Sequence, residues 1–226
     1  MTRVAWALAA CLLLAGCESS VNVDRPPTVR STAPSPSPPL PYSSPSPRSP
    51  SPVSGSPSPS DKPDPRWQFW SHDRHWSSSP WFAGEHRVMI GYGCTADPYY
   101  DPDPRCPHDE GFHHGIDVAM PCGTPLYAGL PGVVVAARSA GALGPAYGPY
   151  AFRIRTRGTD PVDIVIGHVL KVYVDPGQHV RRGQLIARAN DQGAPDGCHL
   201  HFEVRPAAAD YTRAMDPAHY LRLRQG

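Results

Sequence analysis

The sequence predicts a mainly β protein: a single antiparallel β-sheet core domain with irregular loops, behind a long segment that does not fold. Short β-branched runs are separated by turns containing proline and glycine, which is typical of antiparallel strands. No stretch before the C-terminus shows the 3.6-residue period of an amphipathic helix. Proline accounts for 30 of the 226 residues, and half of these prolines lie in one segment.

Five runs are the candidate strands: 132–137, 150–157, 163–170, 184–190 and 199–205. Turn-forming sequences lie among them, at 130–132, 175–177 and 193–195. The run 150–157 alternates, which places Phe152 and Ile154 on one face of a strand and three arginines on the other. We expect these runs to form one small β domain.

The composition divides the chain into a spacer, an extension and a domain. The stretch 26–65 holds 15 prolines and 12 serines. Such a composition buries too little apolar surface to fold, and repeated Ser-Pro favours extended polyproline II. We expect residues 17–65 to be a disordered linker, 66–90 an aromatic N-terminal extension and 91–226 the folded domain. The four tryptophans of the extension form either a packing contact with the domain, which we favour, or a sugar-binding surface.

Residues 1–16 have the pattern of an export signal. Arg3 is followed by an almost wholly apolar run, 4–16, that is too short to span a bilayer. The run ends in Leu-Ala-Gly-Cys17, which resembles the bacterial lipobox, whose cysteine carries lipid. We therefore expect a lipoprotein anchored through Cys17 to the extracytoplasmic face of the cell membrane, with its domain in the cell-wall space. The alternative is an ordinary secretory signal with a chance cysteine.

The formal net charge of +1 gives no basic footprint. A nucleic-acid partner is therefore not expected, because phosphate binding requires clustered lysine and arginine. We expect the chain to act as a monomer. Its anticipated contact with the membrane depends on the N-terminal lipid alone.

Six cysteines are present, of which Cys11 leaves with the signal and Cys17 takes the lipid. The four that remain are Cys94, Cys106, Cys122 and Cys198. An oxidising compartment favours disulfides, and four cysteines allow three connectivities. Pairing across the shortest loop favours Cys94 with Cys106, which leaves Cys122 with Cys198, but the sequence leaves the connectivity open. A cysteine metal site is the weaker alternative, because no CxxC pair occurs.

Four histidines and one aspartate form the candidate site. His113 and Asp117 are four residues apart, a spacing that shares one face of a strand or of a helix. On a strand, His199 and His201 share one face and leave an apolar row for the core. Catalytic zinc takes three nitrogen or oxygen ligands and keeps a fourth position open. His113, Asp117 and His201 would meet that need. His168, after an apolar run, and His199 would remain as imidazoles able to move a proton.

These motifs, in this order, resemble the lysostaphin/LytM-type zinc endopeptidases, which cleave peptide cross-links of bacterial peptidoglycan. The resemblance covers about residues 91–221 and is carried by 112–119, 167–170 and 197–204. It implies a LytM-like peptidase fold and a peptidoglycan peptide as substrate. It also implies Zn²⁺ bound by His113, Asp117 and His201, with catalytic roles for His168 and His199. Some members of the family carry a disulfide at the positions of Cys122 and Cys198.

The sequence departs from the family at two places. Ile166 stands where a tyrosine is common, and the loop 190–197 replaces a Gly/Ser/Thr-rich one. Three other tyrosines are therefore candidates to support an oxyanion: Tyr92, Tyr99 and Tyr100. His108 and His114 flank the motifs and are interpreted as bystanders.

Two functions follow from the resemblance. The first is a zinc-dependent endopeptidase that hydrolyses peptide bonds in the cross-links or stem peptides of peptidoglycan. The alternative is a non-catalytic LytM-like regulator that binds and activates cell-wall hydrolases. The complete set of ligands and histidines favours the enzyme. The sequence does not identify the bond that is cleaved.

Overall fold

The structure is a computed structural model, and it describes residues 62–226. The predictions for the export signal, for the lipid at Cys17 and for nearly all of the linker therefore lie outside the described residues. Within 62–226, no helix combines the length and the apolar character needed to cross a membrane.

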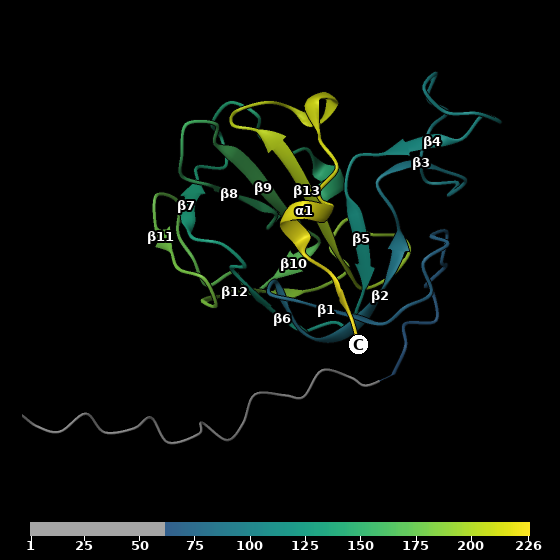
Figure 1. Ribbon diagram of the computed structural model, residues 1–226, viewed down its shortest axis with the longest axis horizontal. Coiled ribbons are helices and arrows are strands. Elements are labelled where there is room, and N and C mark those ends of the chain that lie inside the picture. The colour runs from purple at the N-terminus through teal and green to yellow at the C-terminus, as the bar shows by residue number, and fades with distance from the viewer. Residues whose placement is uncertain (1–61) are drawn as a thin grey trace, which may run out of the picture. The chain divides into compact units, whose positions relative to one another are not determined.

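Strands dominate the described part of the chain (Figure 1). They are β1 (Ser77–Ser79), β2 (Phe82–Ile90), β3 (Gly93–Thr95), β4 (Gly111–His113), β5 (Ile116–Ala119), β6 (Pro125–Tyr127), β7 (Gly132–Val135), β8 (Phe152–Arg155), β9 (Val162–Gly167), β10 (Val169–Leu170), β11 (His179–Val180), β12 (Leu185–Ala189), β13 (His199–Pro206) and β14 (Arg224–Gln225). The helical elements are short: η1 (Pro145–Tyr147), η2 (Tyr211–Arg213) and α1 (Ala218–Leu221). The prediction that no helix of 3.6-residue period precedes the C-terminus agrees with the described residues, in which α1 is the α-helix and η1 is a single 3₁₀ turn.

One large antiparallel sheet organises the domain. Its strands follow the order β10-β12-β6-β2-β5-β13-β9-β8-β7-β11, with β1 pairing to β2 and β14. β3 and β4 form a separate hairpin that projects to one side of the sheet (Figure 1). The predicted fold class, mainly β with an antiparallel core sheet, is confirmed.

The five predicted runs each overlap a strand, namely β7, β8, β9, β12 and β13, and the run 163–170 also includes β10, which is separated from β9 at His168. The strand β2 was not predicted, although it lies within the sheet between β6 and β5. Its apolar and polar residues do not alternate regularly, and its pairing register with β5 shifts between Val88 and Ile90. The segment expected as an extension therefore supplies two strands, β1 and β2, to the sheet.

The core contains the apolar row of β13. Leu200, Phe202 and Val204 are at most 1% exposed, as the period of two predicts. Trp81 packs edge-on against Phe202, with ring centroids 4.9 Å apart, and donates its indole N–H to the carbonyl of Tyr220. Burying side chains of this size stabilises the fold by roughly 1.5–3 kcal/mol each. This core holds the opposite face of β13 rigid.

The tryptophans of the extension divide into two groups. Trp81 is buried, and Trp67 packs partly buried beside Met89. Trp70 and Trp76 remain 37% and 58% exposed. The packing interpretation thus describes two of the four side chains.

The structure contains two disulfides, Cys94–Cys106 and Cys122–Cys198. This is the connectivity that pairing across the shortest loop favours. The first bond links β3 to the loop before β4. The second connects the turn after β5 to the residue that precedes His199.

Candidate metal centre

The strand register brings the candidate residues together around β13. In the sheet, β13 lies between β5 and β9. His201 of β13 is paired with Asp117 of β5 on one side and with Gly167 of β9 on the other. His168 follows Gly167 directly, so three neighbouring strands deliver four of the five candidate side chains. The fifth, His113, ends β4.

His113 and Asp117 lie on two strands rather than on one face of a single element. The residues between them include Gly115, which permits this close passage of the chain. A Cβ atom at Gly115 would lie 2.7 Å from Cε1 of His201 and 2.8 Å from the carbonyl oxygen of Phe202. Glycine is therefore required for β4 and β5 to converge on β13.

Three buried side chains form a compact donor set. Nδ1 of His201 lies 2.8 Å from Oδ1 of Asp117 and 3.2 Å from Nε2 of His113. Nε2 of His113 lies 3.4 Å from Oδ2 of Asp117. Ligand atoms of all three residues lie within 4.8 Å of one another. These are the three residues that the sequence analysis assigned to zinc.

The other ring nitrogens of this set have partners of their own. Nδ1 of His113 lies 2.9 Å from the carbonyl oxygen of Gly91, to which it can donate. Nε2 of His201 lies 3.2 Å from Oε2 of Glu203. When these nitrogens carry the protons, Nε2 of His113 and Nδ1 of His201 each present a lone pair toward Asp117. Such outer partners fix the tautomer and the ring orientation of a metal ligand.

The charges of this cluster are strongly coupled. Burial opposes ionisation of Asp117, yet the charges of His113, His199 and His201 hold its pKa well below the usual value. Burial would also lower the pKa of His201, but the carboxylates of Asp117 and Glu203 outweigh it and raise that pKa to about 9. The site therefore attracts positive charge, which in the metal-free protein is supplied by a proton. A divalent cation would replace that proton.

His199 has one ring nitrogen held and one without a partner. Nδ1 lies 2.9 Å from the carbonyl oxygen of Gly197, to which it can donate. Nε2 is buried, has no hydrogen-bond partner among the described residues, and lies 3.6 Å from Oδ2 of Asp117. An unpartnered polar atom in such a place is costly unless it serves a ligand or a substrate.

His168 adopts a backbone conformation that is uncommon for residues other than glycine. Its φ is 52°, in the left-handed region. The peptide is held there because its N–H donates to the carbonyl of Tyr147 and its carbonyl accepts from Asn190. Strained residues that the surrounding structure fixes in this way gather at functional sites.

The side chain of His168 is held equally firmly. Nδ1 lies 2.9 Å from the carbonyl oxygen of Gln192, and the ring packs edge-on against His199 with centroids 4.5 Å apart. Burial, helped by the neighbouring His199 and His201, lowers the pKa of His168 to about 3. The imidazole is therefore neutral at physiological pH, and Nε2 is its proton acceptor.

Two hollows open over the centre and share part of their walls. One, of about 480 Å³, is lined by His113, His114, Tyr147, His201 and Tyr211, among others. The other, of about 260 Å³, is lined by Asp117, His199 and the loop 193–196. Tyr100, Ala146 and His168 line both, so the hollows together form one cleft across the donor set. None of residues 62–90 lines either hollow.

The structure separates the three candidate tyrosines. Tyr92 donates its hydroxyl to the carbonyl of Ala214, and Tyr99 is 58% exposed and lines the smaller hollow only. Tyr100 lines both hollows, and its ring lies 5.2 Å from that of His113. Burial raises the pKa of Tyr100, so its hydroxyl stays protonated and can donate. His108 and His114 lie outside the donor set.

The sequence analysis missed the residues that support His201. Glu203 is fully buried and contacts His201, Arg205 and the hydroxyl of Tyr147. Arg205 also donates to the Tyr147 hydroxyl, at 2.8 Å. A signal for Glu203 was present, because period two places it on the same face of β13 as His201. Tyr147 had no such signal.

The family model of peptidase family M23 matches residues 111–217. This part of the chain is therefore similar to the M23 peptidases. All five candidate residues lie within the matched range, and so does the supporting carboxylate of Glu203. The strand β2 and the segment before it lie outside that range, although they pack onto the matched region.

Two curated proteins and one solved structure illustrate the similarity. Peptidoglycan DD-endopeptidase ShyA of Vibrio cholerae serotype O1 is 38% identical over 94 residues, 41% of this chain and 20% of ShyA. The uncharacterized lipoprotein YgeR of Escherichia coli K12 is 32% identical over 112 residues, 50% of this chain and 40% of YgeR. The catalytic domain of lysostaphin from Staphylococcus simulans is 25% identical, with a TM-score of 0.47, over 61% of this chain and 92% of that domain. The aligned part of this chain thus spans less than half of either curated relative.

The donor set of His113, Asp117 and His201 fits a zinc ion. Two imidazole nitrogens and one carboxylate oxygen converge from different strands, and both rings have their other nitrogen engaged. This combination of three nitrogen or oxygen ligands is typical of catalytic zinc sites. The adjoining cleft provides space for a further ligand.

Proposed function

We propose that this protein is a zinc-dependent endopeptidase that hydrolyses peptide bonds in the cross-links or stem peptides of bacterial peptidoglycan. The observation that supports it most is the arrangement at β13. A buried donor set of His113, Asp117 and His201 lies beside two further imidazoles, His168 and His199, at the floor of one cleft. A structural zinc site would not need these two histidines.

The relatives support the choice of substrate. ShyA is named a peptidoglycan DD-endopeptidase, and its similarity to this chain extends over 94 residues. The name of YgeR, a lipoprotein, agrees with the lipobox at Cys17. We propose that the lipid places this protein on the extracytoplasmic face of the membrane, and that residues 17–65 let the domain reach into the wall.

The chain's own residues would hold the zinc and move the proton. His113 and His201 would bind it through Nε2 and Nδ1, and Asp117 through its carboxylate. When bound, zinc supplies Lewis acidity, which polarises a carbonyl and makes water more acidic. The neutral imidazole of His168 offers Nε2 as a proton acceptor at the cleft, and His199 presents its unpartnered Nε2 beside it.

The proton balance of hydrolysis fits this pair. One imidazole takes the proton of the attacking water and then returns a proton to the leaving amine, so that the histidines end as they began. The Tyr100 hydroxyl lies in the same cleft and can donate to the carbonyl oxygen as negative charge develops.

The test uses the purified full chain in detergent. Bound zinc is measured, the protein is incubated with purified peptidoglycan, and released fragments are analysed by mass spectrometry. We expect about one zinc per chain, new peptide ends, loss of cleavage with a chelator and recovery with zinc. His201→Ala should lose both zinc and activity. The control, His179→Ala, changes an exposed histidine on β11 and should behave like the parent.

Two results would count against the proposal. Zinc binding without cleavage by the parent protein would favour the regulatory alternative. A parent protein that binds no zinc would refute the assignment of the metal ligands.

A further inference from the structure

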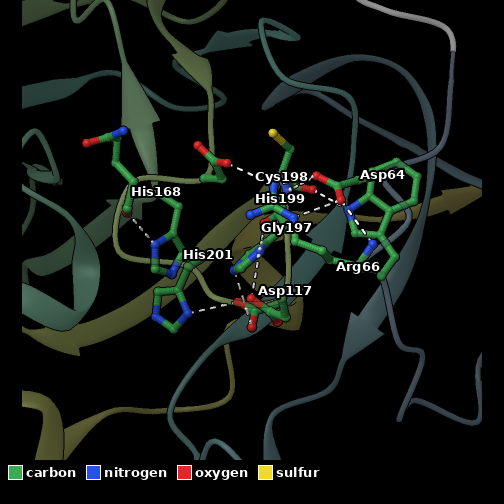
Figure 2. A network of polar contacts seen from close by, with 12 residues as sticks. Asp64, Arg66, Asp117, His168, Gly197, Cys198, His199 and His201 are labelled. Carbon is green, nitrogen blue, oxygen red and sulfur yellow. Dashed lines mark hydrogen bonds and ion pairs between the residues drawn. The ribbon is translucent and has the colours of Figure 1, made fainter.

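A short segment before β1 forms hydrogen bonds with the backbone next to His199. We call residues 64–67, Asp-Pro-Arg-Trp, the strap. The strap lies outside the residues that match the M23 family model, and its first two residues are the last two of the proline-rich stretch 26–65. Figure 2 shows Asp64 and Arg66 on the opposite side of His199 from His168.

The strap holds both polar groups of one peptide residue. Oδ2 of Asp64 accepts the backbone N–H of Cys198, at 3.1 Å. The indole Nε1–H of Trp67 donates to the carbonyl oxygen of Cys198, at 2.6 Å. Cys198 is also covalently joined to Cys122. Cys198, the residue immediately before His199, is therefore held by two hydrogen bonds and one disulfide.

The strap also reaches the start of the loop that Cys198 ends. Nη2 of Arg66 lies 2.8 Å from Oδ2 of Asp191. The same guanidinium binds both oxygens of Asp64, at 3.0 and 2.8 Å, which orients that carboxylate toward Cys198. The loop between these two anchor points forms one wall of the cleft, with residues 193–196.

Close packing leaves the loop end little freedom. A Cβ atom at Gly197 would lie 2.8 Å from Cγ of Asp64, and Gly197 has a φ of +100°. Glycine is needed there for the strap to approach so closely. The carbonyl of Gly197 is the acceptor for Nδ1 of His199. A shift of this peptide would therefore turn the imidazole.

We propose that Asp64 and Trp67 are positioning residues for His199. They hold the Gly197–Cys198 backbone so that Nδ1 of His199 keeps its proton and Nε2 stays aimed at the metal centre. The proposal rests on the proposed endopeptidase function, but its structural part can be tested without catalysis. It extends the working unit of the protein about 47 residues before the start of the M23 match, from Gly111 back to Asp64.

The experiment compares matched variants of the full, zinc-loaded chain. Trp67→Phe keeps an aromatic ring beside Met89 and removes only the donor to Cys198. Asp64→Ala removes the acceptor, whereas Asp64→Asn keeps an oxygen that can accept from the Cys198 N–H. Asp73→Ala is the control, because Asp73 lies in the same part of the chain and bonds only to His75 and Ser71 in the described structure.

Four quantities are measured: kcat and KM on peptidoglycan fragments, the zinc dissociation constant, and the ¹⁵N shifts of the His199 ring. We expect Trp67→Phe and Asp64→Ala to lower kcat about tenfold or more, since a small misplacement of a catalytic group is costly. KM and zinc affinity should change less than about threefold, and the ring should show a mixture of tautomers. Asp64→Asn should recover most of kcat.

Two results would overturn the proposal. One is an unchanged kcat in both strap variants. The other is a parallel loss of kcat, zinc affinity and thermal stability that Asp64→Asn does not relieve, which indicates a merely structural role. If the parent protein cleaves no peptidoglycan, the proposed function fails, and the ¹⁵N shifts alone decide whether the strap positions His199.

Discussion

Oε2 of Glu203 lies 3.2 Å from Nε2 of His201, so the carboxylate can accept a hydrogen bond from Nε2–H of the His201 ring. Both residues lie on β13, two positions apart, and both are buried. This contact leaves Nδ1 of His201 free to face Asp117. In the proposed zinc site, Glu203 would therefore determine which nitrogen of His201 binds the metal.

The first prediction concerns this contact. Glu203→Gln removes the negative charge that stabilises the His201 ring and also weakens the hold of Arg205. We expect the affinity for zinc to fall roughly 10- to 100-fold, as is usual when an outer partner of a metal ligand is lost. Competition with a fluorescent chelator measures it. Glu85→Gln, at an exposed position of β2, should leave the affinity unchanged. Equal affinities for both variants would contradict the role of Glu203.

A second prediction follows from the raised pKa of His201, which is about 9 in the metal-free protein. A histidine has a pKa near 6.5 when unfolded. The folded state therefore holds an extra proton between about pH 6.5 and 9, and the stability from this group is complete below pH 6.5 and lost as the pH rises through 9.

The groups that face His201 are Asp117, His113, His168, Glu203 and Tyr147. Burial alone would lower the pKa of His201, and the carboxylates of Asp117 and Glu203 raise it. Urea unfolding of chelated protein should show the decline between pH 6.5 and 9. Zinc-saturated protein should not show it, because the metal replaces the proton. A chelated protein of constant stability across this range would contradict the assignment.

The third prediction tests an ion pair away from the metal. Asp163 of β9 is fully buried and accepts hydrogen bonds from Arg153 and Arg155, at 2.7 to 3.0 Å. Asp163→Asn leaves the buried guanidinium of Arg153 without its carboxylate, and we expect a loss of about 3–5 kcal/mol in the free energy of unfolding. Chemical denaturation measures it, with exposed Asp160→Asn as control. A loss below about 1 kcal/mol would show that the pair is dispensable.

The fourth prediction compares the two disulfides. Cys122 and Cys198 close a loop of 76 residues, and Cys94 and Cys106 one of 12. A larger loop restricts the unfolded chain more. Replacing Cys122 and Cys198 by serine should therefore lower the free energy of unfolding by about 4 kcal/mol, and replacing Cys94 and Cys106 by about 3 kcal/mol. Only loss of the Cys122–Cys198 bond should also reduce kcat, since Cys198 adjoins His199. Equal effects on kcat would argue against a special role for that bond.

The site could be predicted because its residues lie in short local patterns. His199 and His201 alternate on one strand, and the apolar residues between them are in the core as expected. The pairing of β13 with β5 and β9 could not be predicted, because register depends on contacts across the sheet. The same holds for His113 and Asp117, whose spacing suits one element but which occupy two strands.

Other features had no local pattern at all. Asp64 lies in a proline-rich stretch assigned to the linker, and its partner Cys198 is 134 residues away. Arg153 belongs to an alternating run that predicts a strand correctly. Nothing in that run shows that the arginine is 2% exposed and paired with Asp163. Long-range polar contacts of this kind become visible only in the folded structure.

The measurement that tests the central claim most directly compares the parent chain with His168→Asn. Asparagine removes the imidazole next to His199 but leaves His113, Asp117 and His201 untouched. Zinc content and the rate of peptide-bond cleavage in purified peptidoglycan are determined on the same samples. The proposed mechanism predicts about one zinc in each protein and a rate at least ~100-fold lower in the variant. Equal cleavage by both proteins, or none by either with zinc bound, would contradict it.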